Sequence, residues 1–174
     1  MVWLARKFGK KQEAVKPSPN RLSAQWFSEK ELRCKGAGTC TCNGAMKLNP
    51  IFDAQLAELR NKFGMPMHVN SCCRCASWNK IVKGHPRSLH ISDDEKGGAC
   101  AIDIKRQGGM YDETLAKLAY HLGFSIGVHP HFLHLDVRSM VIGKPKVVFP
   151  YSETGKVELE HYKQLVKGEL KWER

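Results

Sequence analysis

Polar side chains inside otherwise apolar segments are the residues of this 174-residue chain with the clearest potential for chemistry. The segment ACAIDI at 99–104 carries Asp103, and FLHLDVR at 132–138 carries His134 and Asp136. A carboxylate or an imidazole is costly to bury unless it is paired or binds a metal. Residues two apart on a strand share a face, so His134 and Asp136 are expected to point the same way.

A third polar group, His90, follows Ser88 in a turn-like SLH segment. Two strands meeting beside this turn would bring His90, Asp103 and His134 together. Two imidazole nitrogens and one carboxylate oxygen leave a fourth zinc position open, which is typical of a catalytic rather than a structural site. The pattern therefore predicts one catalytic zinc ion, Zn²⁺. The residues alone leave open a second interpretation, in which these histidines are ordinary core or surface side chains.

Hydrophobic spacing predicts the elements that must position these groups. Helices interspersed with strands, without strict alternation, indicate an α+β fold. The first helix begins with a capping box of Ser28 and Glu31. We expect a hairpin around Pro130 between the last two strands. The expected helices span 27–32, 50–63, 112–122 and 157–171, and the expected strands span 67–71, 99–104, 124–129 and 132–138.

Seven cysteines occur in two groups and one isolated position: Cys34, Cys40, Cys42, Cys72, Cys73, Cys75 and Cys100. The spacings C-x5-C-x-C and C-C-x-C differ from the paired C-x2-C knuckles of a zinc ribbon. Free buried thiols are favoured. A disulfide between the groups, such as Cys34 with Cys75, and a structural cysteine–zinc site are the alternatives.

The charge balance predicts a polyanionic partner. There are 28 Lys and Arg against 17 Asp and Glu, a net charge of +11, and 42% of the residues are hydrophobic. Such a chain can bury the core of a single domain, and no apolar run is long enough for a membrane span. Residues 1–20 hold five basic residues and one Glu and end in KPSPN, which predicts a basic, flexible leader. Nucleic acid, an acidic membrane surface and a bacterial envelope all fit the charge.

An ordered set of segments resembles a known family. FSEKELRC, LAELRNKFGMP, VNSCCRCASWN, SLH, AIDI and FLHLDVR are similar to motifs of the zinc D-alanyl-D-alanine carboxypeptidases, over about residues 26–138. That family shares its Hedgehog/DD-peptidase fold with phage peptidoglycan endopeptidases and the Hedgehog signalling domain. The resemblance implies a small central antiparallel sheet flanked by helices, with the zinc site at the sheet. It also implies zinc ligands His90, Asp103 and His134.

The resemblance implies further site residues. Arg74 matches the family's arginine that grips the carboxylate of the peptide substrate, with help from Ser88. Several relatives carry an acidic general base three positions before the last histidine ligand, where this chain has His131. We prefer His131 as the base. Asp136 is the alternative base, or a partner that orients a ligand or pairs with Arg138.

One spacing departs from the family pattern. Relatives commonly place the histidine and aspartate ligands seven residues apart, but His90 and Asp103 are 13 apart because ISDDEKGG lengthens the loop. Loop insertions cost little free energy, so the ligands can be retained. The loop acids Asp93, Asp94 and Glu95 are rival ligands in principle, and we expect them to be solvated.

These expectations define a function. The chain is predicted to be a zinc peptidase that cuts an amide bond in peptidoglycan stem peptides, as a D-Ala-D-Ala carboxypeptidase or an endolysin-type endopeptidase. Residues 21–140 would form the catalytic domain, with 141–174 packed on it as a strand and helix extension. We expect a monomer of phage or prophage origin, held in the host cytoplasm before release to the anionic wall. The alternative is a non-catalytic zinc-containing binding module. Nucleic-acid binding is disfavoured because zinc-finger spacing and stacking motifs are absent from the sequence.

Overall fold

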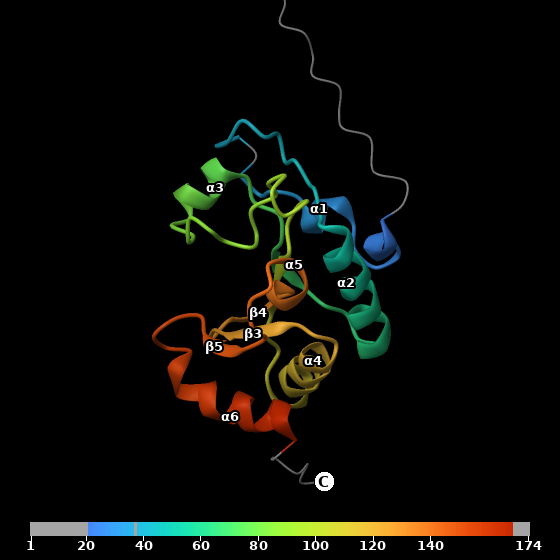
Figure 1. The fold of residues 1–174 in the computed structure, drawn as a ribbon, viewed down its shortest axis with the longest axis vertical. Helices are drawn as coiled ribbons and strands as arrows, with labels where there is room; N and C mark the ends of the chain where they lie inside the picture. The colour runs from blue at the N-terminus through green and yellow to red at the C-terminus, as the bar shows by residue number, and fades with distance from the viewer. Residues whose placement is uncertain (1–20, 37, 169–174) are drawn as a thin grey trace, which may run out of the picture.

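The computed structural model describes residues 21–36 and 38–168, so the predicted leader at 1–20 lies outside the described residues. The elements are arranged around one sheet (Figure 1). The helices are η1 (Leu22–Gln25), α1 (Glu29–Leu32), α2 (Pro50–Phe63), α3 (Ala76–Ile81), α4 (Gly109–His121), α5 (Arg138–Val141) and α6 (Lys156–Lys167). The strands are β1 (Val69–Ser71), β2 (Ala101–Lys105), β3 (Ser125–Val128), β4 (Phe132–Asp136) and β5 (Val148–Pro150).

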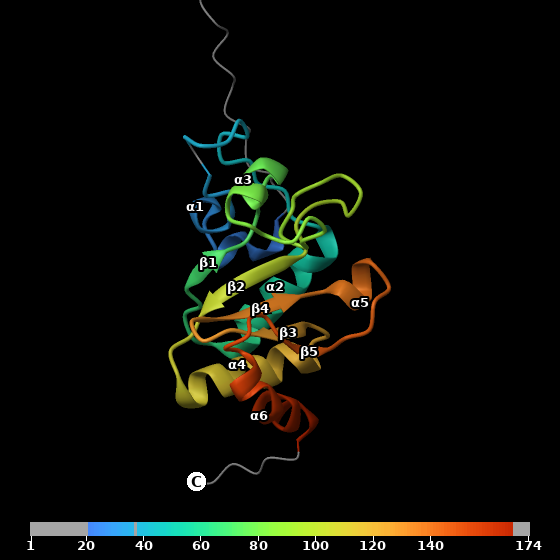
Figure 2. The ribbon, with the colours of Figure 1, turned by 90° about the vertical axis from the view of Figure 1, so that its left-hand side faces the viewer.

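The five strands lie in the order β1-β2-β4-β3-β5 (Figure 2). Strands β1 to β4 pair antiparallel, and the predicted hairpin of β3 and β4 is confirmed. The expectation of an antiparallel sheet is wrong at one edge, because β5 runs parallel to β3. After β4 the chain passes through α5 and reverses its direction. Because β3 and β4 are antiparallel, a segment that runs opposite to β4 and lies beside β3 is parallel to β3. The fold is therefore α+β with a mixed sheet.

Alternation along the strands separates an apolar face of the sheet from a polar one. Ile102, Leu133, Leu135 and Ile126 are fully buried and belong to the hydrophobic core. The core continues into α2 and α4, which lie together on one side of the sheet in Figure 1. Burying one such side chain contributes about 1.5–3 kcal/mol. The polar residues of β2 and β4 consequently point to the opposite face, which helices α2 and α4 do not cover.

Local sequence signals explain where the helices begin and end. The capping box of Ser28 and Glu31 is present at α1. Helix α2 has the predicted bounds, because the Asn49 side chain accepts hydrogen bonds from the amides of Ile51 and Phe52, and Gly64 ends the helix with a left-handed φ of 71°. Helix α4 starts three residues earlier than expected, at Gly109. Helix α6 ends at Lys167 rather than 171, since Gly168 adopts a left-handed φ of 78°.

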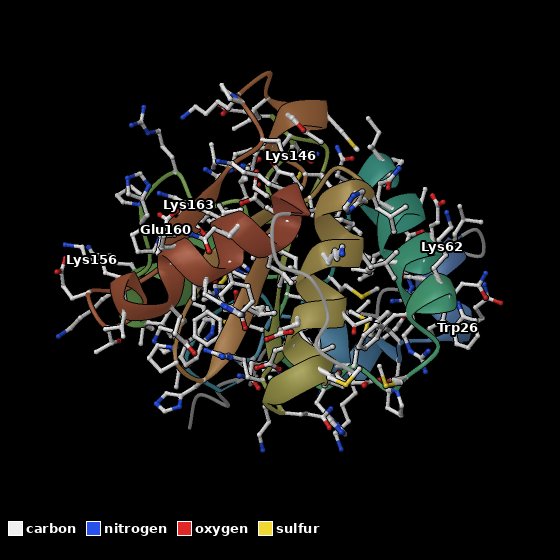
Figure 3. All side chains as sticks on the ribbon, turned by 90° about the horizontal axis from the view of Figure 1, so that it is seen from below. Trp26, Lys62, Lys146, Lys156, Glu160 and Lys163 are labelled. Atoms are coloured by element: carbon white, nitrogen blue, oxygen red, sulfur yellow. The ribbon has the colours of Figure 1, made fainter. Side chains whose placement is uncertain are left out.

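The C-terminal segment packs on the same sheet. Helix α6 lies beside α4, with Lys156, Glu160 and Lys163 on its outer side (Figure 3). Arg106, which follows β2, donates hydrogen bonds to Asp112 of α4 at 2.7 Å and to Glu158 of α6 at 3.0 Å. These ion pairs join the three elements. None of the helices in the described part of the chain has the length and apolar character needed to cross a membrane.

Candidate metal centre

A row of directly paired residues crosses the polar face of the sheet. Ser71 pairs with Asp103, Asp103 with His134, His134 with Gly127, and Gly127 with Phe149, so every strand contributes one residue. The register thus sets Asp103 and His134 side by side on rigid neighbouring strands. A Cβ atom on Gly127 would lie 2.9 Å from side-chain atoms of His134, Phe149 and Tyr151, so the glycine leaves room for these side chains.

His90 completes the cluster from the loop before β2. Its Nε2 lies 3.1 Å from Asp103 Oδ1 and 3.1 Å from His134 Nδ1, and the last two atoms are 2.8 Å apart. All three side chains are buried. Zinc bonds of about 2.0–2.2 Å to nitrogen and oxygen place tetrahedral ligands about 3.4 Å apart. The structure therefore brings the three predicted ligands together at a separation close to that of a zinc site.

Hydrogen bonds on the far side of each imidazole direct a lone pair into the cluster. His90 Nδ1 lies 2.7 Å from the carbonyl oxygen of Cys72, which can only accept, so Nδ1 donates. His134 Nε2 lies 3.1 Å from Asp136 Oδ2, and an ionised carboxylate also only accepts. Nε2 of His90 and Nδ1 of His134 are then free to act as ligands. Partners of this kind fix the orientation of metal-binding histidines.

Asp136 lies behind His134 and not in the pocket. It is fully buried and accepts hydrogen bonds from Arg138 Nε at 2.8 Å and Nη2 at 2.6 Å. Burial would raise the pKa of Asp136, but the Arg138 guanidinium and the His134 imidazole hold that pKa well below its ordinary value. The carboxylate is therefore ionised and fixed between two donors.

Arg74 holds the other carboxylate of the cluster. Its Nη2 donates to Asp103 Oδ2 at 3.0 Å and its Nε donates to Ser71 Oγ at 3.0 Å, which leaves Asp103 Oδ1 facing the histidines. Burial would raise the pKa of Asp103, but the adjacent imidazoles hold it far below its ordinary value. The amide of Arg74 also donates to the carbonyl of His90 at 2.8 Å, so the two segments are joined by their backbones.

A pocket of about 810 Å³ opens beside the cluster. Asp103 and His134 form part of its wall, and so does Ser88, whose Oγ accepts from the amide of His90 at 3.3 Å. Its basic lining residues are Arg74, Lys83, Arg87, Arg138 and Lys144. Among the described residues that line the pocket, Asp103 is the only acidic one. The pocket is thus suited to a ligand with carboxylate groups.

Comparison with known families identifies the chain. The Peptidase M15 model matches residues 25–136, which is more than half of the sequence. The chain belongs to the Peptidase M15 family. This membership makes it a metallopeptidase, in agreement with the donor set of the cluster. No curated protein and no solved structure matches the chain.

Within this M15 peptidase, His131 lies apart from the ligand cluster. Its side chain is exposed in the turn between β3 and β4, its ring centre is 5.5 Å from that of His129, and it does not line the pocket. The loop acids are also elsewhere: Asp94 pairs with Lys47 at 2.5 Å, and Asp93 pairs with Lys96. The base role of His131 stays a prediction from its position in the sequence.

Two aromatic residues of the pocket were missed by sequence reasoning. The ring centre of Tyr151 lies 4.7 Å from that of His134, and Phe149 is 6.0 Å away. Burial raises the pKa of the Tyr151 hydroxyl, so it is protonated at neutral pH and can donate a hydrogen bond. Both residues come after residue 138, where the resemblance ends, and no spacing signal in the sequence marks them.

Proposed function

We propose that this chain is a zinc-dependent peptidase that hydrolyses an amide bond in peptidoglycan stem peptides. The observation that carries the proposal is a cluster of three atoms, His90 Nε2, Asp103 Oδ1 and His134 Nδ1. Their separations are close to those between ligands of a single metal ion, and they lie beside a pocket with a basic lining. Family membership supports metallopeptidase chemistry. The basic lining supports a substrate rich in carboxylates, as stem peptides are.

The donor set and its surroundings fit zinc. Two imidazoles and one carboxylate with a fourth position toward a pocket are typical of catalytic zinc sites. When bound, zinc would polarise the scissile carbonyl and lower the pKa of a water molecule toward neutrality. Asp136 and the Cys72 carbonyl hold the two imidazoles in the required orientation. We therefore assign Asp136 as a positioning residue for His134.

Arg74 and Ser88 are proposed to bind the substrate carboxylate. Both line the pocket next to the ligand cluster. Arg74 Nε and Nη2 already donate to Ser71 and Asp103, and the permanently charged guanidinium has further N–H groups that can donate to a carboxylate. Lys83, Arg87 and Lys144 extend the positive lining outward, which would attract further carboxylates of the stem peptide. Tyr151, protonated and over His134, is placed to donate to the oxygen of the scissile carbonyl.

The proposal keeps His131 as the acceptor of the water proton, on its position three residues before His134. General base catalysis contributes about 10²–10⁴-fold. The variant His131→Ala should therefore lose at least about 100-fold in kcat/KM while its zinc content is unchanged. Wild-type turnover by this variant would remove His131 from the mechanism.

Mass spectrometry of fragments released from defined peptidoglycan tests catalysis and bond position together. Loss of the terminal D-Ala indicates a carboxypeptidase, whereas cleavage within the stem or the cross-bridge indicates an endopeptidase. Release should stop on addition of a chelator and should be absent for His90→Ala. Full hydrolysis by the chelated protein or by this variant would contradict the proposal.

A zinc-containing binding module of the same fold is the second candidate. The observation that favours it is that neither His131 nor Asp136 lines the pocket. Such a module would bind purified muropeptides with zinc present and release no fragment over long incubation. Turnover of the same muropeptides would exclude it.

We further propose a phage or prophage origin, with the chain held in the host cytoplasm until it reaches the wall. The resemblance to phage endopeptidases and the net charge of +11 support this assignment, because a basic protein is attracted to an anionic wall. Expression in a bacterial host should cause lysis only when a membrane-permeabilising protein is produced with it. Lysis without such a protein would contradict the assignment.

A further inference from the structure

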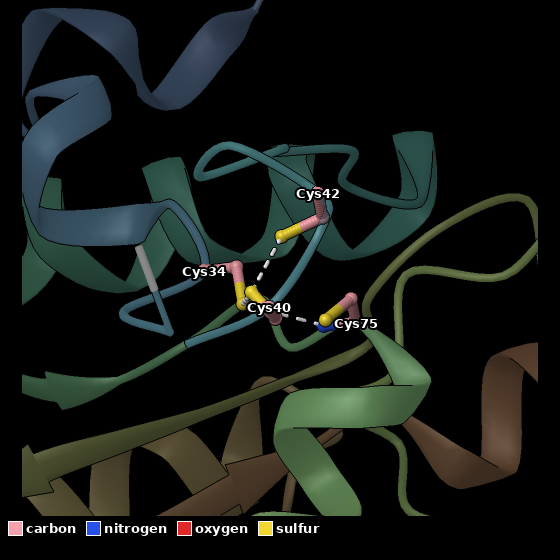
Figure 4. A group of neighbouring side chains, drawn as sticks. All are labelled: Cys34, Cys40, Cys42 and Cys75. Atoms are coloured by element: carbon pink, nitrogen blue, oxygen red, sulfur yellow. Dashed lines mark hydrogen bonds between the residues drawn. The ribbon is translucent and has the colours of Figure 1, made fainter. Parts of the chain in front are cut away.

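The seven cysteines divide into two sets. Cys72, Cys73 and Cys100 belong to the hydrophobic core, where a free thiol packs as a small apolar side chain. The other four lie outside that core and gather at one place, where their side chains point toward one another (Figure 4). They are Cys34, Cys40, Cys42 and Cys75, and they are named the four-cysteine cluster below. Nothing in the proposed hydrolysis uses them.

The sulfur atoms have the separations of a metal site and not those of disulfides. Sγ of Cys40 lies 3.2 Å from Sγ of Cys42 and 4.0 Å from Sγ of Cys34. All four sulfurs lie within 4.8 Å of one another. Tetrahedral zinc with bonds of about 2.3 Å holds its sulfur ligands about 3.8 Å apart. A disulfide needs about 2.05 Å, so each of these pairs is too far apart to be bonded.

Two segments of the chain supply the ligands. Cys34 follows α1, Cys40 and Cys42 lie in the loop after it, and Cys75 is the N-cap of α3. Among the described residues of 33–45, only Cys34, Gly36 and Gly44 are buried, so the loop has no large apolar anchor. Small regions without sufficient core depend on disulfides or metals for their order. A metal would supply that cross-link here.

Backbone amides donate to two of the four sulfurs. The amide of Cys75 donates to Cys34 Sγ at 3.4 Å, and the amide of Trp78 donates to Cys75 Sγ at 3.3 Å. Donors of this kind stabilise charged ligands and fix their direction. A Cβ atom on Gly36 would lie 2.7 Å from Cys40 Sγ and 2.8 Å from the Trp78 ring. The loop therefore closes tightly over the cluster, and a larger residue at 36 would not fit.

We propose that Cys34, Cys40, Cys42 and Cys75 bind a structural zinc ion in a closed four-sulfur site, distinct from the His90–Asp103–His134 cluster. Four cysteine ligands leave no open position, which is typical of a structural zinc site. Cys75 is the neighbour of Arg74, which contacts Asp103. The bound ion would tie the loop after α1 to the segment that presents Arg74. This inference does not depend on the proposed hydrolysis.

Zinc content and X-ray absorption test the proposal on protein purified under reducing conditions. The wild-type chain should carry a second equivalent of zinc beyond that of the His90 site. The variant His90→Ala should keep one equivalent, with sulfur as its only near neighbour at about 2.3 Å. Cys42→Ser should lose the sulfur-bound equivalent, and Cys100→Ala, which alters a core cysteine, should lose none. These four samples separate the two sites.

Several results would overturn the proposal. The first is a His90→Ala protein that circular dichroism shows to be folded but that holds no zinc after dialysis against a zinc-containing buffer. Iron in place of zinc would do so as well, because tetrahedral sulfur sites also accept iron. Disulfides within the cluster in the freshly reduced and dialysed protein, seen as a loss of two hydrogens each in the intact mass, would exclude a zinc site. Because the wild-type absorption spectrum also reports sulfur neighbours, the test does not depend on any variant that fails to fold.

Discussion

Replacing Asp136 with Asn should separate a positioning role from a base role. Asp136 is fully buried and accepts from His134 Nε2 at 3.1 Å and from Arg138 Nη2 at 2.6 Å. An asparagine of the same shape keeps only one acceptor oxygen. Asp136 Oδ2 accepts from both His134 Nε2 and Arg138 Nη2, and Oδ1 accepts from Arg138 Nε. If the amide NH₂ takes the Oδ2 position it opposes the Nε2–H of His134 and Nη2–H of Arg138, and if it takes the Oδ1 position it opposes Nε–H of Arg138. Either arrangement leaves a buried donor without an acceptor.

The expected magnitude follows from that lost acceptor. An unsatisfied buried donor costs about 1–3 kcal/mol. Loss of a partner that orients a metal-binding histidine costs about 10–100-fold in metal affinity, which corresponds to about 1.4–2.8 kcal/mol. The two figures agree. We therefore expect Asp136→Asn to weaken zinc binding at the His90 site by 10–100-fold, and to leave the maximal turnover within about tenfold of wild type.

Turnover measured against buffered free zinc provides the assay, because its midpoint gives the Kd of the catalytic site and its plateau gives kcat. Asp112→Asn is the matched control: it alters a carboxylate that is also buried and bound to an arginine, Arg106, but lies outside the metal cluster. The control should lose stability without moving the midpoint. An unchanged midpoint for Asp136→Asn with a plateau lowered 1,000-fold would refute the positioning role and make Asp136 the base.

Three further substitutions test other contacts. Arg74→Lys should raise KM at least tenfold, because a guanidinium can hold Asp103 with Nη2 and keep other N–H groups for a substrate carboxylate, whereas a lysine has one nitrogen for both; steady-state kinetics on a stem peptide would show it. Gly127→Ala should cost about 1–3 kcal/mol in thermal unfolding and weaken zinc binding, because its Cβ meets the His134 and Tyr151 side chains. Arg106 lowers the pKa of Glu158. Its stabilisation is present above the ordinary pKa of 4.5 and is lost as pH falls through the lowered pKa, so Glu158→Gln should cost up to about 1 kcal/mol at pH 7 and progressively less as pH falls below 4.5 in urea unfolding.

The sequence was informative where a residue's local pattern decides its environment. Asp103 and His134 were predicted to meet because each is a polar residue in an apolar strand, and burial of such a group needs a partner. Strand register then determines the pair. The direction of β5 could not be predicted, because pairing of a short edge strand depends on where α5 turns the chain, and no periodicity records that turn. Tyr151 follows β5 and was missed for the same reason.

The cysteines show a different limit. Spacing rules compare ligands along the chain, and C-x5-C-x-C with C-C-x-C matches none of the common zinc patterns. What selects Cys75 over its neighbours is three-dimensional: Cys72 and Cys73 are buried in the core, while Cys75 caps α3 beside the loop after α1. Position along the chain groups Cys75 with Cys72 and Cys73, whereas the fold brings its sulfur to those of Cys34, Cys40 and Cys42.

The charges around the candidate catalytic centre explain why a metal there would matter beyond its chemistry. Asp103 and Asp136 are ionised, and Arg74 and Arg138 contact one carboxylate each. Burial would lower the pKa of His134, but its hydrogen bonds to Asp103 and Asp136 raise that pKa to about 9. In the metal-free site this imidazole is therefore protonated at neutral pH, and with the two carboxylates and two guanidinium groups it gives a net charge of +1. A divalent cation held by His90, Asp103 and His134 would leave a net charge of +2 in a partly buried site, where electrostatic interactions are stronger than in water. The same residues that bind the metal would thereby strengthen the attraction for a substrate carboxylate, so metal binding and substrate binding should be coupled.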